Sequence, residues 1–352
     1  MSRRTIAIAA SLSLLAIGSP LITACANPLA NNSFNSGVHK YEQGDYQGAI
    51  ADYNKAIEIN PESADAYYNR GLAKSELKDY QGAIADYNKA IEINPDDVDA
   101  YNNRGEAKHK LKDYQGAIVD YDKAIEVNPR SAAAYSNRGI VKRELKDYRG
   151  AIVDYNKAIE INPQSAAAYN NRGNSRRNLE DYQGAIADYN KAIEINTQYA
   201  DAYSNRGIAK YDLKDYQAAI ADYNKAIEIN PQNADAYNNR GLAKYDLKDY
   251  QGAIADYNKA TEISPKFAFA YYNRGHARKN LEDYQGAIAD YTKAIEINPD
   301  FASAYGSRGY AKGVGFQDEN GACSDFKKAA SLGDKYRVNW LNSDEGAWCR
   351  NM

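Results

Sequence analysis

The sequence predicts an all-α protein, a solenoid of about nine antiparallel helix hairpins closed by a C-terminal cap. The stretch DYQGAIADYNKAIEINP occupies residues 45–61 and returns unchanged at residues 79–95, and near copies follow at the same interval. Within each copy, apolar residues recur at the spacing of one helix face. Tyrosine accounts for 32 residues, against 6 phenylalanines and 2 tryptophans, which indicates duplication of one tyrosine-rich unit.

The N-terminus carries the pattern of an export signal. MSRR is a short positive region, and the apolar run over residues 5–18 is too short to be interpreted first as a membrane-spanning helix. We expect a signal peptide over residues 1–24 and a short linker over residues 25–33. The sequence Ile22-Thr23-Ala24-Cys25 resembles a bacterial lipobox, which makes Cys25 the expected lipidation site at a cell envelope, facing the periplasm. Ordinary signal cleavage to a soluble periplasmic or secreted form, and an uncleaved anchor, are the alternatives.

Each expected repeat consists of two helices. In the second repeat, the first helix covers residues 64–77 and the second covers residues 79–93. The second helix carries one apolar stripe of 3.6-residue period, formed by Ala83, Ile84, Tyr87, Ala90 and Ile91. We expect Asp79 to cap this helix through its carboxylate, and Asn94-Pro95 to end it because the residue before proline avoids the α region.

The crossing point of the two helices is expected at small residues. Gly71 and Ala83 are nearly equidistant from the turn at Lys78, so the sequence places them at similar height in the hairpin. We expect these two residues to face each other and let the helices approach closely, with tyrosine rings filling the adjacent gaps.

Stacking of neighbouring hairpins is required because one hairpin buries too little apolar surface to offset the cost of ordering it. The eight expected repeats span residues 30–301: 30–63, 64–97, 98–131, 132–165, 166–199, 200–233, 234–267 and 268–301. In the next frame an extra residue appears and the recurring Tyr and Pro are lost. We therefore expect a degenerate ninth repeat over residues 302–335 and a C-terminal cap over residues 336–352.

The repeat resembles the tetratricopeptide repeat. Counted from the start of a 34-residue frame, position 4 is aromatic, 8 is Gly, 20 is Ala, 24 is aromatic, 27 is Ala and 32 is Pro in most frames, with Thr197 in place of the proline in one of them. The resemblance covers residues 30–335. It implies a right-handed superhelix whose first helices line a concave face that binds a protein or an extended peptide. Arg at position 7 and Lys or Arg at position 11 depart from the family's usual Leu and Tyr.

Position 6 is asparagine in seven repeats, similar to the asparagine ladder in the repeat domain of O-linked GlcNAc transferase. A side-chain amide both donates and accepts hydrogen bonds, so such a row could hold a peptide backbone without selecting its side chains. Copying of the whole unit, or a role between adjacent hairpins, would also explain the row. The candidate peptide-binding residues are Asn69, Asn103, Asn137, Asn171, Asn205, Asn239 and Asn273.

Position 12 varies between repeats, as a specificity position would. It is basic at Arg143 and Arg177 and aromatic at Tyr211 and Tyr245, which favours an extended ligand with acidic residues near the two arginines. Drift after duplication is the alternative. Position 7 is a row of arginines at the hairpin height of the aspartates at position 23, so we predict a repeating Arg–Asp ion pair with a structural role.

Three cysteines are present. If Cys25 carries lipid, Cys323 and Cys349 remain as a candidate disulfide in an oxidising compartment, with two separate thiols as the alternative.

Signals of catalysis are weak. The three histidines, His39, His109 and His276, stand in different repeats and outside any zinc motif, so no catalytic residue, metal or cofactor is expected. The net charge of −3 gives no general attraction for nucleic acid. The sequence thus favours a non-enzymatic scaffold that binds a protein or peptide and meets the membrane only through a lipid anchor. A spacer without a specific ligand and an RNA-binding helical repeat are the alternatives, and the oligomeric state is left open.

Overall fold

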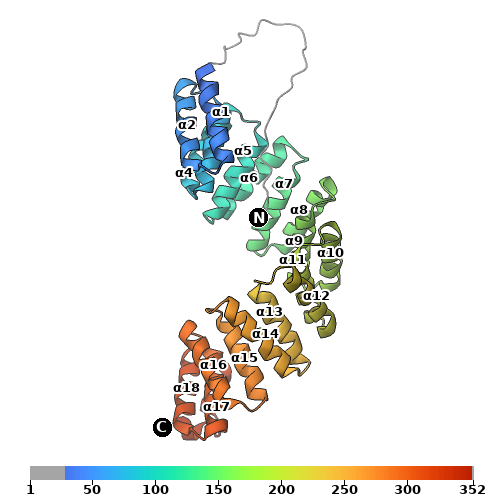
Figure 1. Ribbon diagram of the computed structural model, residues 1–352, viewed down its shortest axis with the longest axis vertical. Helices are drawn as coiled ribbons and strands as arrows, with labels where there is room; N and C mark the ends of the chain where they lie inside the picture. The colour runs from blue at the N-terminus through green and yellow to red at the C-terminus, as the bar shows by residue number, and fades with distance from the viewer. Residues whose placement is uncertain (1–27, 351–352) are drawn as a thin grey trace. The chain divides into compact units, whose positions relative to one another are not determined.

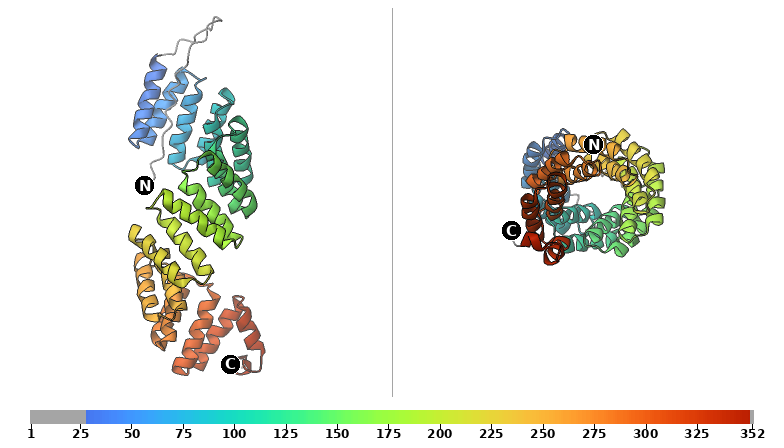
Figure 2. Two further views of the ribbon diagram at one scale, coloured as in Figure 1. Left: turned by 90° about the vertical axis from the view of Figure 1, so that its right-hand side faces the viewer. Right: turned by 90° about the horizontal axis from the view of Figure 1, so that it is seen from below.

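The computed structural model describes residues 28–350, and this part of the chain is helical without strands, as expected. It forms two compact units, the first ending at Lys112 and the second beginning at Asp113. Within each unit the helices pack in chain order as antiparallel neighbours (Figures 1 and 2). The helices are α1 (Pro28–Glu42), α2 (Tyr46–Ile59), α3 (Ala64–Glu76), α4 (Tyr80–Ile93), α5 (Val98–Lys110), α6 (Tyr114–Val127), α7 (Ala132–Glu144), α8 (Tyr148–Ile161), α9 (Ala166–Asn178), α10 (Tyr182–Ile195), α11 (Ala200–Asp212), α12 (Tyr216–Ile229), α13 (Ala234–Asp246), α14 (Tyr250–Ile263), α15 (Ala268–Asn280), α16 (Tyr284–Ile297), α17 (Ala302–Phe316), α18 (Glu319–Ser331), α19 (Lys335–Asn342) and α20 (Ala347–Arg350).

Helix caps set the boundaries within each repeat. The Asp79 carboxylate accepts a hydrogen bond from the backbone N–H of Gly82, as the sequence predicts, and the equivalent aspartates do the same in the other repeats. Five first helices also have side-chain caps, at Ser63, Asp97, Ser131, Ser165 and Asn233. Three first helices begin without one, after Tyr199, Phe267 and Phe301.

The tyrosines at position 24 form the core of each hairpin. Tyr87 and its equivalents in the other repeats up to Tyr291 are at most 1% exposed. The atoms nearest to the place that a Gly71 side chain would take belong to this tyrosine ring. A Cβ built on Gly71 would lie 2.6 Å from Cε1 of Tyr87. The absence of a side chain at position 8 therefore makes room for the buried ring.

The first helices of successive repeats contact one another along one face of each unit. In the second unit α9 contacts α11, α11 contacts α13, and α13 contacts α15. Within a unit, a second helix packs between the first helix of its own repeat and that of the next, as α14 does between α13 and α15. Within each unit, the first helices therefore form a continuous surface on which the candidate residues of that unit lie.

The N-terminal end of the described chain differs from the expected boundary, and the C-terminal end agrees with it. The expected linker over residues 25–33 is helical from Pro28, because α1 starts there and packs on α2. The signal peptide and Cys25 lie outside the described residues. At the other end, the degenerate repeat keeps its hairpin of α17 and α18, seen beside the C-terminus in Figure 2.

The C-terminal segment packs on α18. A disulfide joins Cys323 of α18 to Cys349 of α20. The Trp340 ring lies edge-on to Phe326 with centroids 4.9 Å apart, and the Arg337 guanidinium carbon lies 4.1 Å from the Phe326 ring centroid. The arginine and the two rings cover a hairpin face on which no further repeat stacks.

Candidate functional site

The asparagine row lies on the surface of the first helices, and all seven members are partly exposed. Three of them donate to the side chain at position 5 of the preceding repeat. Asn103 donates to the Tyr68 hydroxyl at 2.8 Å, and Asn273 donates to Asn238 Oδ1 at 2.9 Å. Asn205 makes the same bond to position 5 of its neighbour, at 3.0 Å. These amides thus link adjacent hairpins, which is one of the two roles that the sequence left open.

The carbonyl ends of these amides remain available. Among the described residues, none donates a hydrogen bond to Oδ1 of Asn103, Asn205 or Asn273. An amide oriented by its neighbour and accepting nothing within the chain can accept a hydrogen bond from a ligand.

The four specificity candidates are partly exposed and fall into two kinds. Arg143 and Arg177 make no side-chain hydrogen bond or ion pair with another described residue. The aromatic pair instead bridges repeats through position 13. Tyr211 donates to Asp246 Oδ2 at 2.5 Å, and Asn280 donates to the Tyr245 hydroxyl at 2.8 Å. The side chains of Arg143 and Arg177 are therefore better able than the two tyrosines to bind an acidic ligand.

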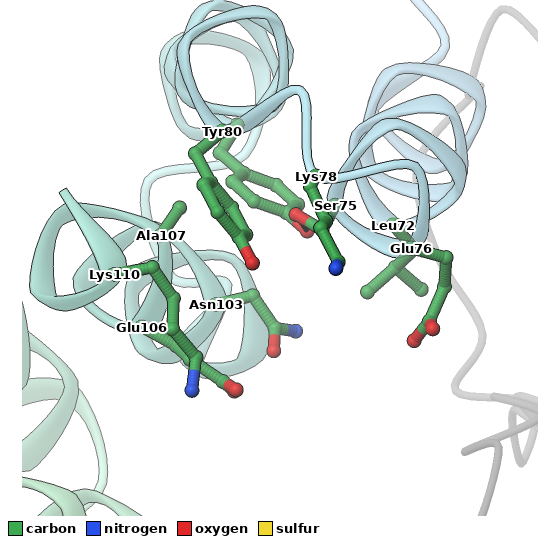
Figure 3. Close-up of a pocket in the computed structure, with 10 residues that line it drawn as sticks. Leu72, Ser75, Glu76, Lys78, Tyr80, Asn103, Glu106, Ala107 and Lys110 are labelled. Carbon is green, nitrogen blue, oxygen red and sulfur yellow. Dashed lines mark hydrogen bonds between the residues drawn. The ribbon is translucent and has the colours of Figure 1, made fainter. Parts of the chain in front are cut away.

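Two pockets lie at the same place in different repeats, each between two successive first helices and above the position-24 tyrosine. The pocket of the first unit has a volume of about 430 Å³ and lies between α3 and α5 (Figure 3). The pocket of the second unit has a volume of about 220 Å³ and lies between α13 and α15. Both include positions 9 and 12 of one repeat and positions 6 and 9 of the next. The sequence did not reveal these cavities, although it singled out positions 6 and 12, which line them.

The pocket of the first unit, which we call the charged pocket, has charges of both signs. Glu76 of α3 stands across from Glu106 and Lys110 of α5, and Lys78 comes from the turn (Figure 3). The Tyr87 hydroxyl at its floor is 3.3 Å from the hydroxyl of Ser75. Such walls suit a polar occupant.

The pocket of the second unit, which we call the aromatic pocket, has a different chemistry. Its lining consists of Leu242, Tyr245, Tyr257, Tyr272, Asn273 and His276. The His276 ring lies edge-on to Tyr272 with centroids 4.5 Å apart. Burial lowers the pKa of His276 to about 4, with a smaller contribution from the Lys279 charge, so the imidazole is neutral at pH 7.

The predicted Arg–Asp pair is present, and it is less exposed than a surface ion pair. Arg70 binds Asp86 of its own repeat with two hydrogen bonds of 2.9 and 2.5 Å. Its third nitrogen donates to Asn54 of the preceding repeat at 2.6 Å, while Lys74 reaches Asp86 at 2.8 Å. We call this set the arginine clamp, and it joins the second helices of adjacent repeats. Its sequence signal is the basic residue at position 11 of every repeat, where the family usually has tyrosine.

The first repeat completes the same arrangement without arginine. Ser36 donates to Asp52 at 2.6 Å, and the Lys40 ammonium lies 2.6 Å from the same carboxylate. Hydrogen bonds from Lys40 and then Ser36 lower the pKa of Asp52 from 3.8 to about 2.

Across residues 28–350 no helix is long and apolar enough to cross a membrane, and no three His, Cys, Asp or Glu side chains gather as metal ligands.

Stacked two-helix units of 34 residues, with glycine under a buried ring, define a helical-repeat protein of the tetratricopeptide class. Family models described as "TPR repeat" and "Tetratricopeptide repeat" together match the chain without a break from residue 39 to residue 301. The chain belongs to the tetratricopeptide-repeat family. The first model matches residues 39–78, 75–112, 173–214 and 209–248, and the other two match residues 98–131, 132–165, 234–267, 268–301 and 154–187.

Two solved structures, the first two described below, have the same fold. A tetratricopeptide repeat protein from Parabacteroides merdae is 21% identical, with a TM-score of 0.57 over 71% of this chain and 98% of that one. Pseudomonas aeruginosa pilF is 21% identical, with a TM-score of 0.52 over 57% and 92%. YrrB, described as a TPR protein with an unusual peptide-binding site, is 27% identical, with a TM-score of 0.44 over 52% and 95%. No curated protein matches the chain. Family membership supports a protein-interaction scaffold. Tetratricopeptide proteins are also generally non-enzymatic.

Proposed function

We propose that this chain is a non-enzymatic scaffold of the cell envelope that holds an extended segment of a partner protein along its first helices. The observation that carries the proposal is the recurrence of a pocket at the same repeat position in both units, beside an asparagine of the row. A spacer would need helix packing but no hollow between its first helices.

The polar groups suit an extended backbone. Asn103 and Asn273 are oriented by bonds to the preceding repeat and keep their carbonyl oxygens for the N–H groups of a peptide. Each such bond contributes about 0.5–1.5 kcal/mol, so affinity comes from the row and from the pockets. The position-12 residues then select the partner's side chains, acidic ones opposite Arg143 and Arg177.

The location is proposed from the N-terminal sequence. The apolar run and the lipobox-like sequence ending at Cys25 support export and lipid anchoring, with the repeats facing the periplasm. A Cys25→Ser variant of an anchored protein leaves the membrane fraction. Retention of that variant in the membrane fraction would contradict the lipid anchor.

Site-specific crosslinking in intact cells tests the scaffold. A photoreactive residue in place of Asn239, on the proposed binding face, should give one discrete adduct that mass spectrometry identifies. The matched control replaces Lys259, which is exposed on the second helix of the same repeat. Adducts at neither position would favour a spacer. Arg143→Glu with Arg177→Glu should weaken an adduct formed near them, and an unchanged adduct would remove the preference for acidic ligands.

A further inference from the structure

Tyr257, which lines the aromatic pocket, has a buried hydroxyl without a partner. Tyr257 is 0% exposed, and its hydroxyl makes no hydrogen bond with any described residue. A buried hydroxyl left unsatisfied costs free energy, and a site that recovers this cost does so by binding an acceptor.

Equivalent tyrosines show which way this hydroxyl points. The Tyr87 hydroxyl lies 3.3 Å from Ser75, which is position 12 of its repeat and lines the charged pocket. The Tyr189 hydroxyl donates to Asn174, at position 9, at 2.8 Å. In the repeat of Tyr257, positions 9 and 12 are Leu242 and Tyr245, which both line the aromatic pocket. The polar end of Tyr257 thus lies at the pocket wall, beside residues that do not bond to it.

The walls of the aromatic pocket select against charge. None of its six lining side chains carries a carboxylate or an ammonium group, and His276 is neutral at pH 7. A charged occupant would lose its hydration without gaining a partner. The charged pocket, with two glutamates and two lysines at the same repeat position, shows that the fold itself does not impose this neutrality.

We propose that the aromatic pocket is a subsite for a tyrosine side chain of the bound partner. Its ring packs among Leu242, Tyr245 and Tyr272, and its phenolic oxygen accepts a hydrogen bond from the Tyr257 hydroxyl. Tyrosine is the amino acid that combines an uncharged ring with an oxygen at the tip. The inference rests on the proposed function, since the tyrosine belongs to the protein that the scaffold holds.

Small probes test the subsite without knowledge of the partner. The chain has three histidines, and His276 alone lines the aromatic pocket. Its ring protons, assigned with a His276→Gln variant, are followed by NMR while the full chain is titrated with para-cresol, toluene or tetramethylammonium at pH 7. We expect para-cresol to shift the His276 signals saturably and to bind about 2- to 10-fold more tightly than toluene, the gain of one hydrogen bond. His39 and His109 serve as internal references.

Two variants identify the groups involved. Tyr257→Phe should remove the preference for para-cresol over toluene and leave toluene binding unchanged. Tyr155→Phe is the matched control, because Tyr155 is also 0% exposed with an unpartnered hydroxyl but does not line this pocket. Leu242→Glu should weaken both ring probes, and the fold accommodates glutamate at this position in Glu106.

Three results would overturn the proposal: no saturable shift of His276, equal affinity for para-cresol and toluene, or tighter binding of tetramethylammonium than of para-cresol. Each result concerns the subsite alone. A scaffold that binds its partner through the asparagine row would still give a crosslink at Asn239, so failure of the subsite and failure of the proposed function are distinguishable.

Discussion

At the scale of single residues, the turn between the two helices of a repeat contains a strained position. Position 15 has positive φ in seven repeats, between 62° and 65°, yet it is lysine or glutamate in each of them. An L-residue with a side chain pays about 1–2 kcal/mol for this left-handed conformation. The first repeat has Gly44 there, with φ of 81° and no atom within 4 Å of the place that a Cβ would take. The chain therefore holds both the strained and the relaxed form of one turn.

Replacing the strained residue should stabilise the protein. Lys248→Gly removes the left-handed penalty but adds freedom to the unfolded chain, which leaves a net gain of about 0.5–1 kcal/mol in the free energy of unfolding. Urea denaturation followed by circular dichroism measures it. Gly44→Lys is the reciprocal variant and should lose a similar amount; equal stability of both variants and the parent would show that the turn is not strained.

The contacts of Asp52 with Ser36 and Lys40 in the first repeat make the free energy of unfolding depend on pH. The pKa of Asp52 is about 2 in the folded chain, and its ordinary value of 3.8 applies to the unfolded chain. The unfolded state therefore binds the proton more readily. The contribution of Asp52 is complete above about pH 4 and is lost as the pH falls toward 2. Urea midpoints measured across this range should fall less steeply for Asp52→Asn than for the parent. Parallel slopes would contradict the ion pair with Lys40.

At the scale of the hairpin, packing depends on a glycine and a ring. A Cβ on Gly241 would lie 2.6 Å from Cε1 of Tyr257, whose ring is completely buried. Gly252, in the second helix of the same repeat, differs because its nearest neighbour is the flexible carboxylate of Asp249. Ala218 already occupies that place in the preceding repeat, and its N–H still donates to Asp215 at 3.2 Å.

Matched substitutions separate these two glycines. Gly241→Ala should reduce the free energy of unfolding by about 1–3 kcal/mol because it overpacks the core. Gly252→Ala should be neutral or stabilise the helix by up to about 0.5–1 kcal/mol. Chemical denaturation of the two variants side by side gives both values, and a similar loss in each would mean that the tyrosine does not press on position 8.

The arginine clamp is the second device at this scale. Asp256 is 3% exposed and accepts two hydrogen bonds from Arg240, which also bonds to Asn224 of the preceding repeat at 2.7 Å. Lys244 remains a partner of Asp256, at 2.8 Å. Removing the arginine therefore leaves a buried carboxylate with half of its partners.

Arg240→Ala should cost about 2 kcal/mol of the free energy of unfolding, less than a fully orphaned buried ion pair because Lys244 stays. The control is Lys259→Ala, which breaks an exposed pair with Glu262 in the same repeat and should cost at most about 0.5 kcal/mol. Equal effects in guanidinium denaturation would show that the clamp behaves as a surface pair.

At the scale of the whole chain, the repeated pattern was enough to predict the fold. The period of 34 and the apolar stripe gave the hairpins, and proline and aspartate gave the helix ends, because these are local effects. The site was predicted only in part. Which first-helix residues share a surface follows from the period, but the bond from Asn103 to Tyr68 and the hollow above Tyr257 depend on how one repeat stacks on the next. Equivalent positions in different repeats have side chains of different size and charge. The repeat period does not predict how these side chains together shape a cavity.

The disulfide predicts how far a disturbance spreads. The bond closes a 26-residue loop, and removing it through Cys349→Ser should destabilise the cap by roughly 3 kcal/mol. Since each repeat touches only its neighbours, amide exchange should accelerate in α19 and α20 and stay unchanged in α11 and α12. Hydrogen exchange with mass spectrometry measures both regions at once. Uniform acceleration would mean that the second unit unfolds as one cooperative body.

The arginine clamp has a consequence for how such a chain changes length. Excision of residues 200–233 would place Arg240 opposite Asn190 in place of Asn224, and these two asparagines are bonded by arginine in the same way, at 2.6 and 2.7 Å. The arginine–asparagine bond at the new junction would be the same as the one that it replaces. Loss or gain of a whole frame therefore leaves the arginine clamp intact at every junction between repeats. The length of the surface offered to a partner can then change by one repeat at a time.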